Sequence, residues 1–545
     1  MKSHCTWLSV LCPQTNLLSG RGSFVSFLFA IITRSNIKSN NSMNLAVVYS
    51  RTNDGIDAPQ VTVEVHLGNG LPGFSIVGLP ELAVKESKDR VRAALLNSNF
   101  EFPAKRIMVN LAPADIPKDG GRFDLPIALG ILAASGQLSE KMLADYEFIG
   151  ELSLGGQLRP VKGVLPTAYA ANKANRGLFV PQENADEASL IKALPVFSAN
   201  HLLQICAHLT ETEKLLPHVS KAGTRLAKYT ADLSDVKGQY QARRALEVAA
   251  AGGHNLLMVG PPGTGKTMLA TRLATILPPM TEDEALESAT IASISDQGFN
   301  VANWGLRPVR EPHHTSSGVA LVGGGAKVRP GEVSLSSSGV LFLDELTEFD
   351  RRVLDVLREP LETGKITISR AARQATYPAK FQLVAAMNFC PKGIDCDPAQ
   401  NNCECSLEQQ RRYRSKISAP FLDRIDLQIE VPRLSREDLQ KPAMGESSEK
   451  VRERVIVARN RQMQRQKKSN ITLSNKEIEK YCKLNPSDEA LLAQVMDKFK
   501  LSARAYHRIL KVARTIADLA DSEQIQTAHI SEAVSYRSMD RLRGH

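Results

Sequence analysis

Two short runs of residues carry side chains that together could bind and hydrolyse a nucleoside triphosphate. The first run lies between an apolar stretch, 254–259, and a helical stretch, 268–277, and consists of Gly260, Pro261, Pro262, Gly263, Thr264, Gly265, Lys266 and Thr267. Glycines let backbone N–H groups point at phosphates, and the N-terminus of a helix adds partial positive charge. In such a loop Lys266 reaches the outer phosphates and Thr267 binds Mg²⁺.

The second run ends another apolar stretch with two carboxylates. Residues 340–343 are apolar, and Asp344 and Glu345 follow them directly. Asp344 could complete a magnesium site, and Glu345 could orient and polarise the attacking water. Because both runs occur in order, each beside a stretch that predicts a buried strand, the sequence indicates a protein that binds ATP and Mg²⁺ and hydrolyses the ATP.

Composition indicates a protein of several domains that does not cross a membrane. The chain has 545 residues, of which 43% are hydrophobic and 23% charged, and a formal net charge of +10. At about 150 residues per domain, this length accommodates about three or four domains. A mild basic excess permits a nucleic-acid partner without requiring one. The sequence has no apolar run of about 18 residues that could span a membrane, and its 8 cysteines do not form the pattern of a secreted disulfide framework. We therefore expect a cytoplasmic protein.

Changes in pattern along the chain predict the order of its domains. Before Met43 there is no Asp or Glu, and we expect this N-terminal extension to be disordered, or absent because the start codon was assigned too far upstream. Alternating strands and helices follow, then a looser connector, then the nucleotide-binding core, and finally helical stretches only. The predicted boundaries are 1–42 for the extension, 43–204 for an α+β domain, 205–234 for a linker, 235–431 for the core and 432–545 for a helical lid.

A series of motifs gives the chain a resemblance to a known family. In the core these motifs are Asp235-Val236-Lys237-Gly238-Gln239, the phosphate-binding loop, Arg310-Glu311-Pro312-His313-His314-Thr315, Gly323-Gly324-Gly325, Arg329-Pro330-Gly331-Glu332, Ala385-Ala386-Met387-Asn388 and Phe421-Leu422-Asp423-Arg424-Ile425-Asp426. In this order they resemble the magnesium-chelatase-like branch of the AAA+ ATPases. Further motifs at 61–65, 78–81, 110–115 and 120–126 narrow the resemblance to the YifB/ComM family, over residues 43–540.

The resemblance implies a multidomain α/β fold. It consists of an N-terminal Lon-protease-like (ribosomal S5 domain 2-like) α+β domain, an AAA+ P-loop α/β core and a C-terminal helical lid. Characterised members of the family are ring-forming DNA branch-migration helicases used in natural transformation. The implied function is therefore an ATP-driven DNA motor, and the alternative is a chelatase/MoxR-like ATPase chaperone that remodels a protein partner.

The family pattern also assigns roles to three polar residues. Asn388 resembles the sensor that helps to place the lytic water. Arg424 resembles the arginine finger supplied to the γ-phosphate of the neighbouring subunit, a role typically worth about 10³–10⁵ in rate. Arg504 resembles the lid arginine that senses the γ-phosphate in the nucleotide pocket of its own subunit. For either arginine the alternative is a solvated helix face or a structural ion pair. A finger acting on a neighbour implies a homo-oligomeric ring, expected to be a hexamer.

Two basic segments are candidates for contact with DNA. The glycine-rich segment 323–331 reads as a flexible loop, and 364–373 alternates like a β-hairpin. In related motors such elements project into the central pore. The residues that could grip phosphates there, without reading bases, are Lys327, Arg329, Arg370 and Arg373. The expected partner is single-stranded or branched DNA of any sequence. The alternative is that these charges lie on loops that pack the ring.

Four cysteines after Asn388 could form a metal site. Cys390, Cys396, Cys403 and Cys405 could bind a structural zinc ion through four thiolates. Relatives often carry Asn-Pro-Cys-Pro-Cys-Gly here, whereas residues 388–393 read Asn-Phe-Cys-Pro-Lys-Gly, so thiols in a surface loop are the alternative. The pair His313-His314 is a weak candidate for a second metal site, and we favour a packing or hydrogen-bonding role for it.

The N-terminal domain resembles the proteolytic domain of Lon but departs from it at the nucleophile. Arg122 stands where the nucleophilic serine is expected. Lys162 lies in the region of the partner lysine, but without a serine it has nothing to activate. We therefore expect no peptidase activity.

Overall fold

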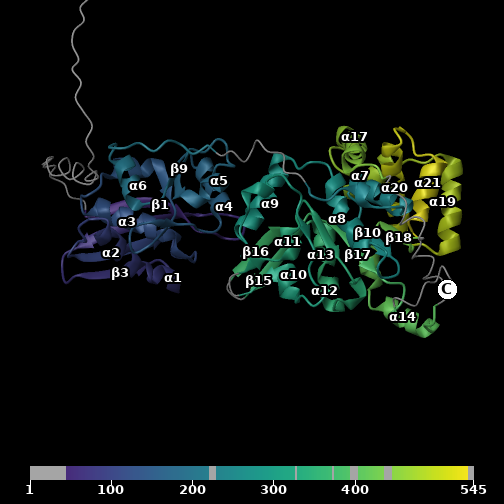
Figure 1. The fold of residues 1–545 in the computed structure, drawn as a ribbon, viewed down its shortest axis with the longest axis horizontal. Coiled ribbons are helices and arrows are strands. Elements are labelled where there is room, and N and C mark those ends of the chain that lie inside the picture. Colours follow the sequence, from purple (N-terminus) through teal and green to yellow (C-terminus); the bar gives the residue numbers. More distant parts are fainter. Residues whose placement is uncertain are drawn as a thin grey trace, which may run out of the picture. The chain divides into compact units, whose positions relative to one another are not determined.

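The structure is a computed structural model that describes residues 44–219, 229–325, 328–370, 373–392, 403–434 and 445–537, without the side chains of Arg370 and Arg373. The predicted extension 1–42 lies outside these residues. Figure 1 shows the chain from its N-terminal strands to the C-terminal helices. Within the described residues, no helix combines the length and apolarity needed to cross a membrane.

A mixed sheet forms the first folded region. Its strand order is β3-β4-β2-β1-β5-β8-β9, and β1, β5, β8 and β9 run parallel to one another. The strands are β1 (Leu45–Arg51), β2 (Gln60–Gly68), β3 (Gly73–Val77), β4 (Arg106–Ala112), β5 (Tyr146–Phe148), β8 (Gly177–Pro181) and β9 (Val196–Ala199), and a small ribbon is made by β6 (Glu151–Leu152) and β7 (Leu158–Arg159). In β2 every second residue from Val61 to Leu67 is buried, as expected for a strand with one face on a core.

Helices cover this sheet. They are α1 (Leu82–Lys85), α2 (Ser87–Asn97), α3 (Asp124–Ala134), α4 (Val164–Lys173), α5 (Ala185–Ala188) and α6 (Leu202–Leu209). All residues of α3 are buried and all but Asp124 are apolar, so this helix lies inside the core. Gly130 of α3 lies so close to β2 that a Cβ there would stand 2.5 Å from the side chain of Val65, which explains a glycine in mid-helix.

A parallel sheet forms the centre of the second region. Its order is β11-β14-β17-β10-β18. The strands are β10 (Leu256–Val259), β11 (Val309–Arg310), β14 (Val340–Leu343), β17 (Gln382–Met387) and β18 (Leu427–Glu430). Every residue of β10, β14 and β17 is buried. Successive side chains of a strand point to opposite faces, and Leu256 and Leu257 accordingly belong to two different hydrophobic cores.

The first of these cores contains the C-terminal helices. These are α17 (Ser448–Gln466), α18 (Asn475–Tyr481), α19 (Pro486–Phe499), α20 (Ala503–Leu519) and α21 (Thr527–Ser535). Val455 of α17 and Ile516 of α20 lie in one core with Leu256, together with residues of α7 (Tyr240–Gly252) and α8 (Lys266–Ile276). The helical region therefore packs directly on one face of the parallel sheet.

The opposite face carries short helices and two hairpins. The helices are α10 (Gly318–Val322), α11 (Glu332–Leu335), α12 (Arg351–Val356), α13 (Arg358–Thr363), α14 (Leu407–Ser415) and α15 (Ala419–Leu422), and the hairpins are β12 (Gly323–Gly324) with β13 (Arg329–Pro330) and β15 (Lys365–Arg370) with β16 (Arg373–Pro378). The hairpin predicted over 364–373 is thus confirmed, although it extends to Pro378. The prediction of a multidomain α/β fold with a helical C-terminal region is also confirmed, and the structure adds that the sheet of the core is parallel.

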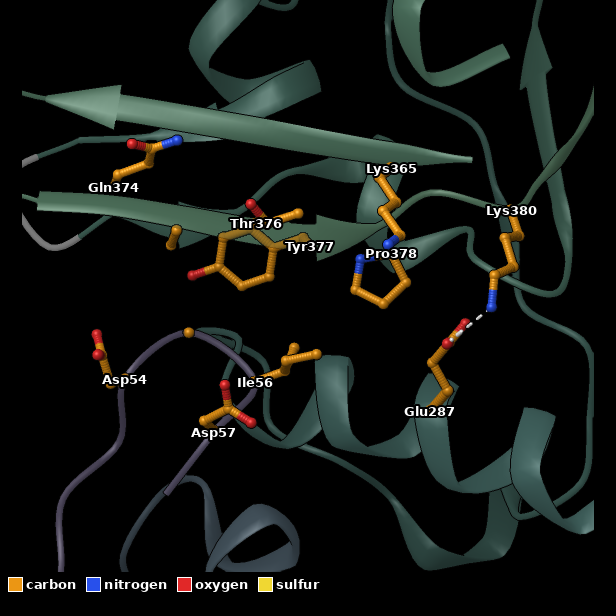
Figure 2. Close-up of a pocket in the computed structure, with 12 residues that line it drawn as sticks. Asp54, Ile56, Asp57, Glu287, Lys365, Gln374, Thr376, Tyr377, Pro378 and Lys380 are labelled. Carbon is orange, nitrogen blue, oxygen red and sulfur yellow. Dashed lines mark hydrogen bonds and ion pairs between the residues drawn. The ribbon is translucent and has the colours of Figure 1, made fainter. Parts of the chain in front are cut away.

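Segments of the two regions contact each other. Ala289 of α9 (Glu282–Ser293) is buried in a hydrophobic cluster with residues of α4, and Gly163 N–H donates to the carbonyl of Ser293 at 3.0 Å. Figure 2 shows a second contact, in which the turn 54–57 faces the β15–β16 hairpin across a cavity of 360 Å³. The side chain of Ile56 packs against the core that includes this hairpin.

Candidate functional site

The phosphate-binding loop joins the end of β10 to the start of α8 and depends on its glycines. Gly263 and Gly265 have φ angles of +77° and +86°, in the left-handed region that side chains disfavour. At Gly260 a Cβ would lie 2.2 Å from the carbonyl oxygen of Val431. The backbone can therefore form this loop only with glycine at these positions, and it places the N-terminus of α8 beside the loop.

The Lys266 side chain is folded onto the phosphate-binding loop. Its Nζ donates to the carbonyl oxygens of Gly260 and Pro261, each at 2.9 Å, and lies 3.3 Å from Oδ1 of Asn388. Burial lowers the pKa of Lys266, and the nearby carboxylates of Asp344 and Glu345 partly offset this effect. The ammonium is therefore held by neutral oxygens that a triphosphate would replace.

Thr267 and Asp344 meet as expected for a magnesium site. Thr267 Oγ1 donates to Oδ2 of Asp344 at 2.7 Å, and the two residues come from the starts of α8 and of the turn after β14. A hydroxyl and a carboxylate are oxygen donors that suit Mg²⁺, which keeps several waters and binds few protein ligands. These two side chains would hold the ion next to the phosphates.

Glu345 is fixed in an unusual backbone conformation and has a partner that the sequence did not reveal. Its φ angle is +50°, and its N–H donates to Oδ1 of Asp344 at 2.8 Å. Its Oε2 lies 3.3 Å from Nδ1 of His314. The contact forms because β11 and β14 are neighbouring parallel strands, with Arg310 beside Leu341. His314 follows β11 and Glu345 follows β14, so both lie beyond the same ends of the two strands. The contact agrees with the hydrogen-bonding role favoured for the histidine pair.

Glu311 belongs to the same motif as His314, residues 310–315, and its pKa responds to the charge of Asp344. Glu311 has a raised pKa, because it is partly buried and because the charge of Asp344 opposes its ionisation. The segment 310–315 therefore forms one wall of the site. The sequence analysis used this motif for the resemblance and gave Glu311 no role.

Asn388 lies at the carboxyl end of β17, the strand next to β10. Its Oδ1 faces Lys266 Nζ, so it is placed between the phosphate-binding loop and the carboxylates of β14. The ends of three parallel strands thus bring Lys266, Asp344 and Asn388 together, as expected for a ligand site at the carboxyl edge of such a sheet.

Arg424 lies at the other edge of this sheet. Asn255, which precedes β10, donates to the carbonyl of Arg424 at 3.0 Å, whereas the phosphate-binding loop follows β10. Strand β10 has four residues, and at about 3.3 Å per residue it separates the carbonyl of Arg424 from the start of the phosphate-binding loop by about 13 Å. The Arg424 side chain is 9% exposed, and its guanidinium pairs with Glu362 and donates to the carbonyl of Pro420.

The charge of Arg504 acts on the guanidinium of Arg424. Burial lowers the pKa of Arg424, Glu362 raises it, and the cations Arg358, Arg504 and Arg508 lower it further. Arg504 is exposed on α20, one turn before Arg508. The role of Arg504 as a sensor of the γ-phosphate stays a prediction. The position of its helix is set by the packing of α20 on α7 and α17.

Asp426 anchors this group of arginines. It is fully buried, forms an ion pair with Arg508 and accepts the Asn255 N–H at 3.0 Å. Burial acts to raise the pKa of Asp426, but Arg508, His254 and the Asn255 N–H together hold it well below the ordinary value. The start of β18 is thereby tied to α20.

The proposed DNA contacts are described only in part. Lys327 lies outside the described residues, as do the side chains of Arg370 and Arg373. Arg329 lies on β13 and forms an ion pair with Asp296. The same carboxylate lies 3.4 Å from Lys162 Nζ of the first region. A phosphate that binds Arg329 would therefore compete with Asp296.

Three of the four candidate metal ligands converge. The sulfur atoms of Cys390, Cys403 and Cys405 all lie within 4.8 Å of one another, and two of these residues are buried. Cys396 lies outside the described residues.

Arg122, at the position of the expected serine, is a buried structural residue. It donates to the carbonyl of Lys162 and, at 3.0 Å, to Oδ1 of Asn53. Burial lowers the pKa of Arg122 to about 10, against the opposing charges of Asp119 and Glu187. The arginine thus ties the Lys162 loop to the turn after β1.

Comparison with known proteins identifies the family. Models described as "Magnesium chelatase, subunit ChlI", "Subunit ChlI of Mg-chelatase" and "Magnesium chelatase, subunit ChlI C-terminal" match residues 232–439, 63–184 and 445–537. The chain is 54% identical to Competence protein ComM of Haemophilus influenzae over 505 residues, which cover 92% of this chain and 99% of that protein. The chain belongs to the YifB/ComM family of magnesium-chelatase-like proteins.

Two further members of this family are nearly as similar. YifB of Salmonella typhimurium is 52% identical over 504 residues and YifB of Escherichia coli 50% identical over 505, each match covering 92% of this chain and 99% of the relative. The magnesium-chelatase family is AAA+ ATPase-like, which supports an ATPase that uses ATP and Mg²⁺. This agrees with the grouping of Lys266, Thr267 and Asp344 at one edge of the sheet.

Proposed function

We propose that this chain is a subunit of an ATP-hydrolysing ring that moves on DNA and promotes branch migration. The observation that carries the ring is the separation of the phosphate-binding loop from Arg424. The loop lies at the carboxyl edge of the parallel sheet, whereas the backbone of Arg424 lies at its amino edge. An arginine that cannot reach the phosphates of its own chain can act only on those of a neighbour, and head-to-tail contacts of this kind close into rings.

Each residue of the bound site has a definable task. Lys266 exchanges its backbone oxygens for the outer phosphates, and Thr267 and Asp344 hold Mg²⁺ beside them. Glu345 orients the attacking water, with His314 holding the carboxylate, and Asn388 helps to place that water. Arg424 of the adjacent subunit leaves the exposed carboxylate of Glu362 and stabilises the charge that develops on the γ-phosphate.

Three observations support DNA as the substrate. The chain carries a net charge of +10, and its two hairpins β12–β13 and β15–β16 bear basic residues. Arg329 is bound to a single exposed carboxylate, which a phosphate can displace. The Haemophilus relative is named a competence protein, so we infer that integration of incoming DNA during natural transformation is the process served. A hexamer is the expected ring.

The test is ATP turnover with and without single-stranded and branched DNA, together with migration of a synthetic four-way junction. We expect strong stimulation by either DNA and ATP-dependent junction movement, and neither with Lys266→Ala. Arg412→Ala, which changes an exposed arginine on α14, should behave as wild type. ATP turnover indifferent to DNA would contradict the motor and favour the remodelling of a protein partner, the function suggested by the chelatase-named family models.

A further inference from the structure

We propose that Cys390, Cys403 and Cys405 bind one structural Zn²⁺ ion that holds the end of strand β17 against helix α14. Their sulfur atoms lie within 4.8 Å of one another. In a tetrahedral site with Zn–S bonds of about 2.3 Å, two sulfur atoms are separated by about 3.8 Å. The cluster therefore needs only a small contraction to enclose the ion, and a water or one further donor fills the fourth position.

Helix α14 contacts the sulfur cluster through Gln410. Gln410 Nε2 lies 3.4 Å from Cys403 Sγ and donates to the carbonyl of Cys405 at 3.2 Å. Cys405 also directly precedes Ser406, the N-cap of α14. Hydrogen-bond donors such as the Gln410 amide are typical of the shell around metal-binding cysteines.

The environments of the other described cysteines differ from that of this cluster. Cys206 and Cys482 are each buried within a large apolar core, and burial raises the pKa of each thiol to about 12. They behave as small apolar side chains. Cys390, Cys403 and Cys405 instead form a small cluster of their own, separate from the large cores. Apolar packing explains the first two residues but gives no reason for three sulfur atoms to converge.

Zinc fits this donor set better than other metals. Thiolates are soft ligands, and a tetrahedral sulfur site selects zinc or an iron–sulfur centre over Mg²⁺ or Ca²⁺. Zinc has no redox chemistry and no geometric demand beyond the tetrahedron, which suits a site with a purely structural role.

The position of the cluster connects it to the nucleotide site. Cys390 is two residues beyond Asn388, whose side chain faces Lys266. On the other side, Cys405 leads into α14, where Tyr413 accepts a hydrogen bond of 2.7 Å from Thr347. Thr347 lies in the turn directly after Glu345. The ion would thus link the strand that carries Asn388 to the helix that supports the turn of the catalytic carboxylates, without touching the phosphate-binding loop.

The inference is tested first by metal content, which is independent of any motor activity. The full chain is purified under reducing conditions without chelator, and zinc, copper and iron are measured by mass spectrometry. We expect about one zinc ion per chain in wild type and in the control Cys482→Ala, and a loss of at least about tenfold in Cys403→Ser. Absence of zinc from the wild type, full zinc content in Cys403→Ser, or copper or iron in place of zinc would each overturn the assignment.

A second measurement covers the case in which Cys403→Ser does not fold. Wild-type protein stripped with a chelator is titrated with Co²⁺, which gives intense sulfur-to-metal absorption when bound by thiolates in a tetrahedron. We expect this absorption to appear and then to vanish on addition of Zn²⁺. Stripping should also reduce kcat for ATP more than it raises KM, and Zn²⁺ should restore it. Failure of folded, stripped protein to bind Co²⁺ would refute the site.

Discussion

Catalysis shared between subunits predicts a defined outcome for mixed rings. Arg424→Ala removes the donated arginine but leaves the phosphate-binding loop intact, and Lys266→Ala does the reverse. Each variant alone should lose about 10³-fold or more in ATP turnover. When the two are mixed in equal amounts and reassembled, a working boundary needs an intact loop on one subunit and an intact arginine on the next.

The size of the recovery follows from counting boundaries. One half of the subunits carry an intact loop, and one half of their neighbours carry an intact Arg424, so about one quarter of the boundaries in a random ring are complete. We therefore expect the mixture to regain about one quarter of wild-type turnover per subunit. ATP turnover is measured before and after subunit exchange, with Arg412→Ala mixed with Lys266→Ala as the control for exchange.

The same experiment can refute the reasoning. If Arg424 served the nucleotide of its own chain, every subunit of the mixture would lack one essential group, and turnover would stay at the level of the variants. If mass spectrometry shows mixed rings but their ATP turnover does not rise, shared catalysis is contradicted. The structural basis of the prediction would then be wrong, because it is the length of β10 that separates Arg424 from the phosphates.

Three further outcomes are expected. Removal of the imidazole in His314→Ala frees the side chain of Glu345 and should lower kcat about tenfold, the equivalent of about one hydrogen bond, with KM for ATP little changed. Asp426→Asn removes the buried carboxylate that pairs with the half-buried Arg508 and should lower the free energy of unfolding at pH 7 by about 3 kcal/mol in denaturant titrations. Arg329→Ala should weaken DNA binding to all sequences and reduce the slope of log affinity against log salt by about one.

Each of these outcomes has a matched control. His313→Ala leaves the contact with Glu345 in place, so an equal loss of kcat there would contradict the positioning role of His314. Asp521→Asn changes an exposed carboxylate and should have little effect on stability. Lys192→Ala removes an exposed cation of the first region, and DNA binding as weak as that of Arg329→Ala would show a non-specific charge effect.

The acid dependence of stability gives a further check on Asp426. Because the folded state holds the pKa of this carboxyl below its unfolded value, its contribution is complete above about pH 4 and is lost as the pH falls further. Wild type should therefore lose stability below about pH 4 more steeply than Asp426→Asn. Parallel acid curves for the two proteins would contradict the buried ion pair with Arg508.

Sequence reasoning succeeded where chemistry depends on residues close together in the chain. The phosphate-binding loop and the Asp344–Glu345 pair each lie on a strand end, and parallel strands bring their ends to one edge, so the contact of Thr267 with Asp344 could be anticipated. The parallel core and the helical C-terminal region could be predicted from buried runs and helical periodicity for the same local reasons.

Contacts between distant segments could not be predicted in this way. The location of Arg504 depends on how α20 packs over the sheet, and that packing is a property of a whole hydrophobic core. The contact of His314 with Glu345 depends on the register of β11 against β14. The pairing of Arg329 with Asp296 depends on side chains from separate loops, for which a motif carries no information.

The burial of Ala289 has a consequence for how independent the parts of this molecule are. This residue belongs to the helix α9 of the ATPase region, yet it completes an apolar cluster whose other members come mostly from the N-terminal region. A shortened chain that lacked the N-terminal region would expose this patch to water and lose solubility. The N-terminal region thus supplies most of the apolar surface against which this part of α9 packs.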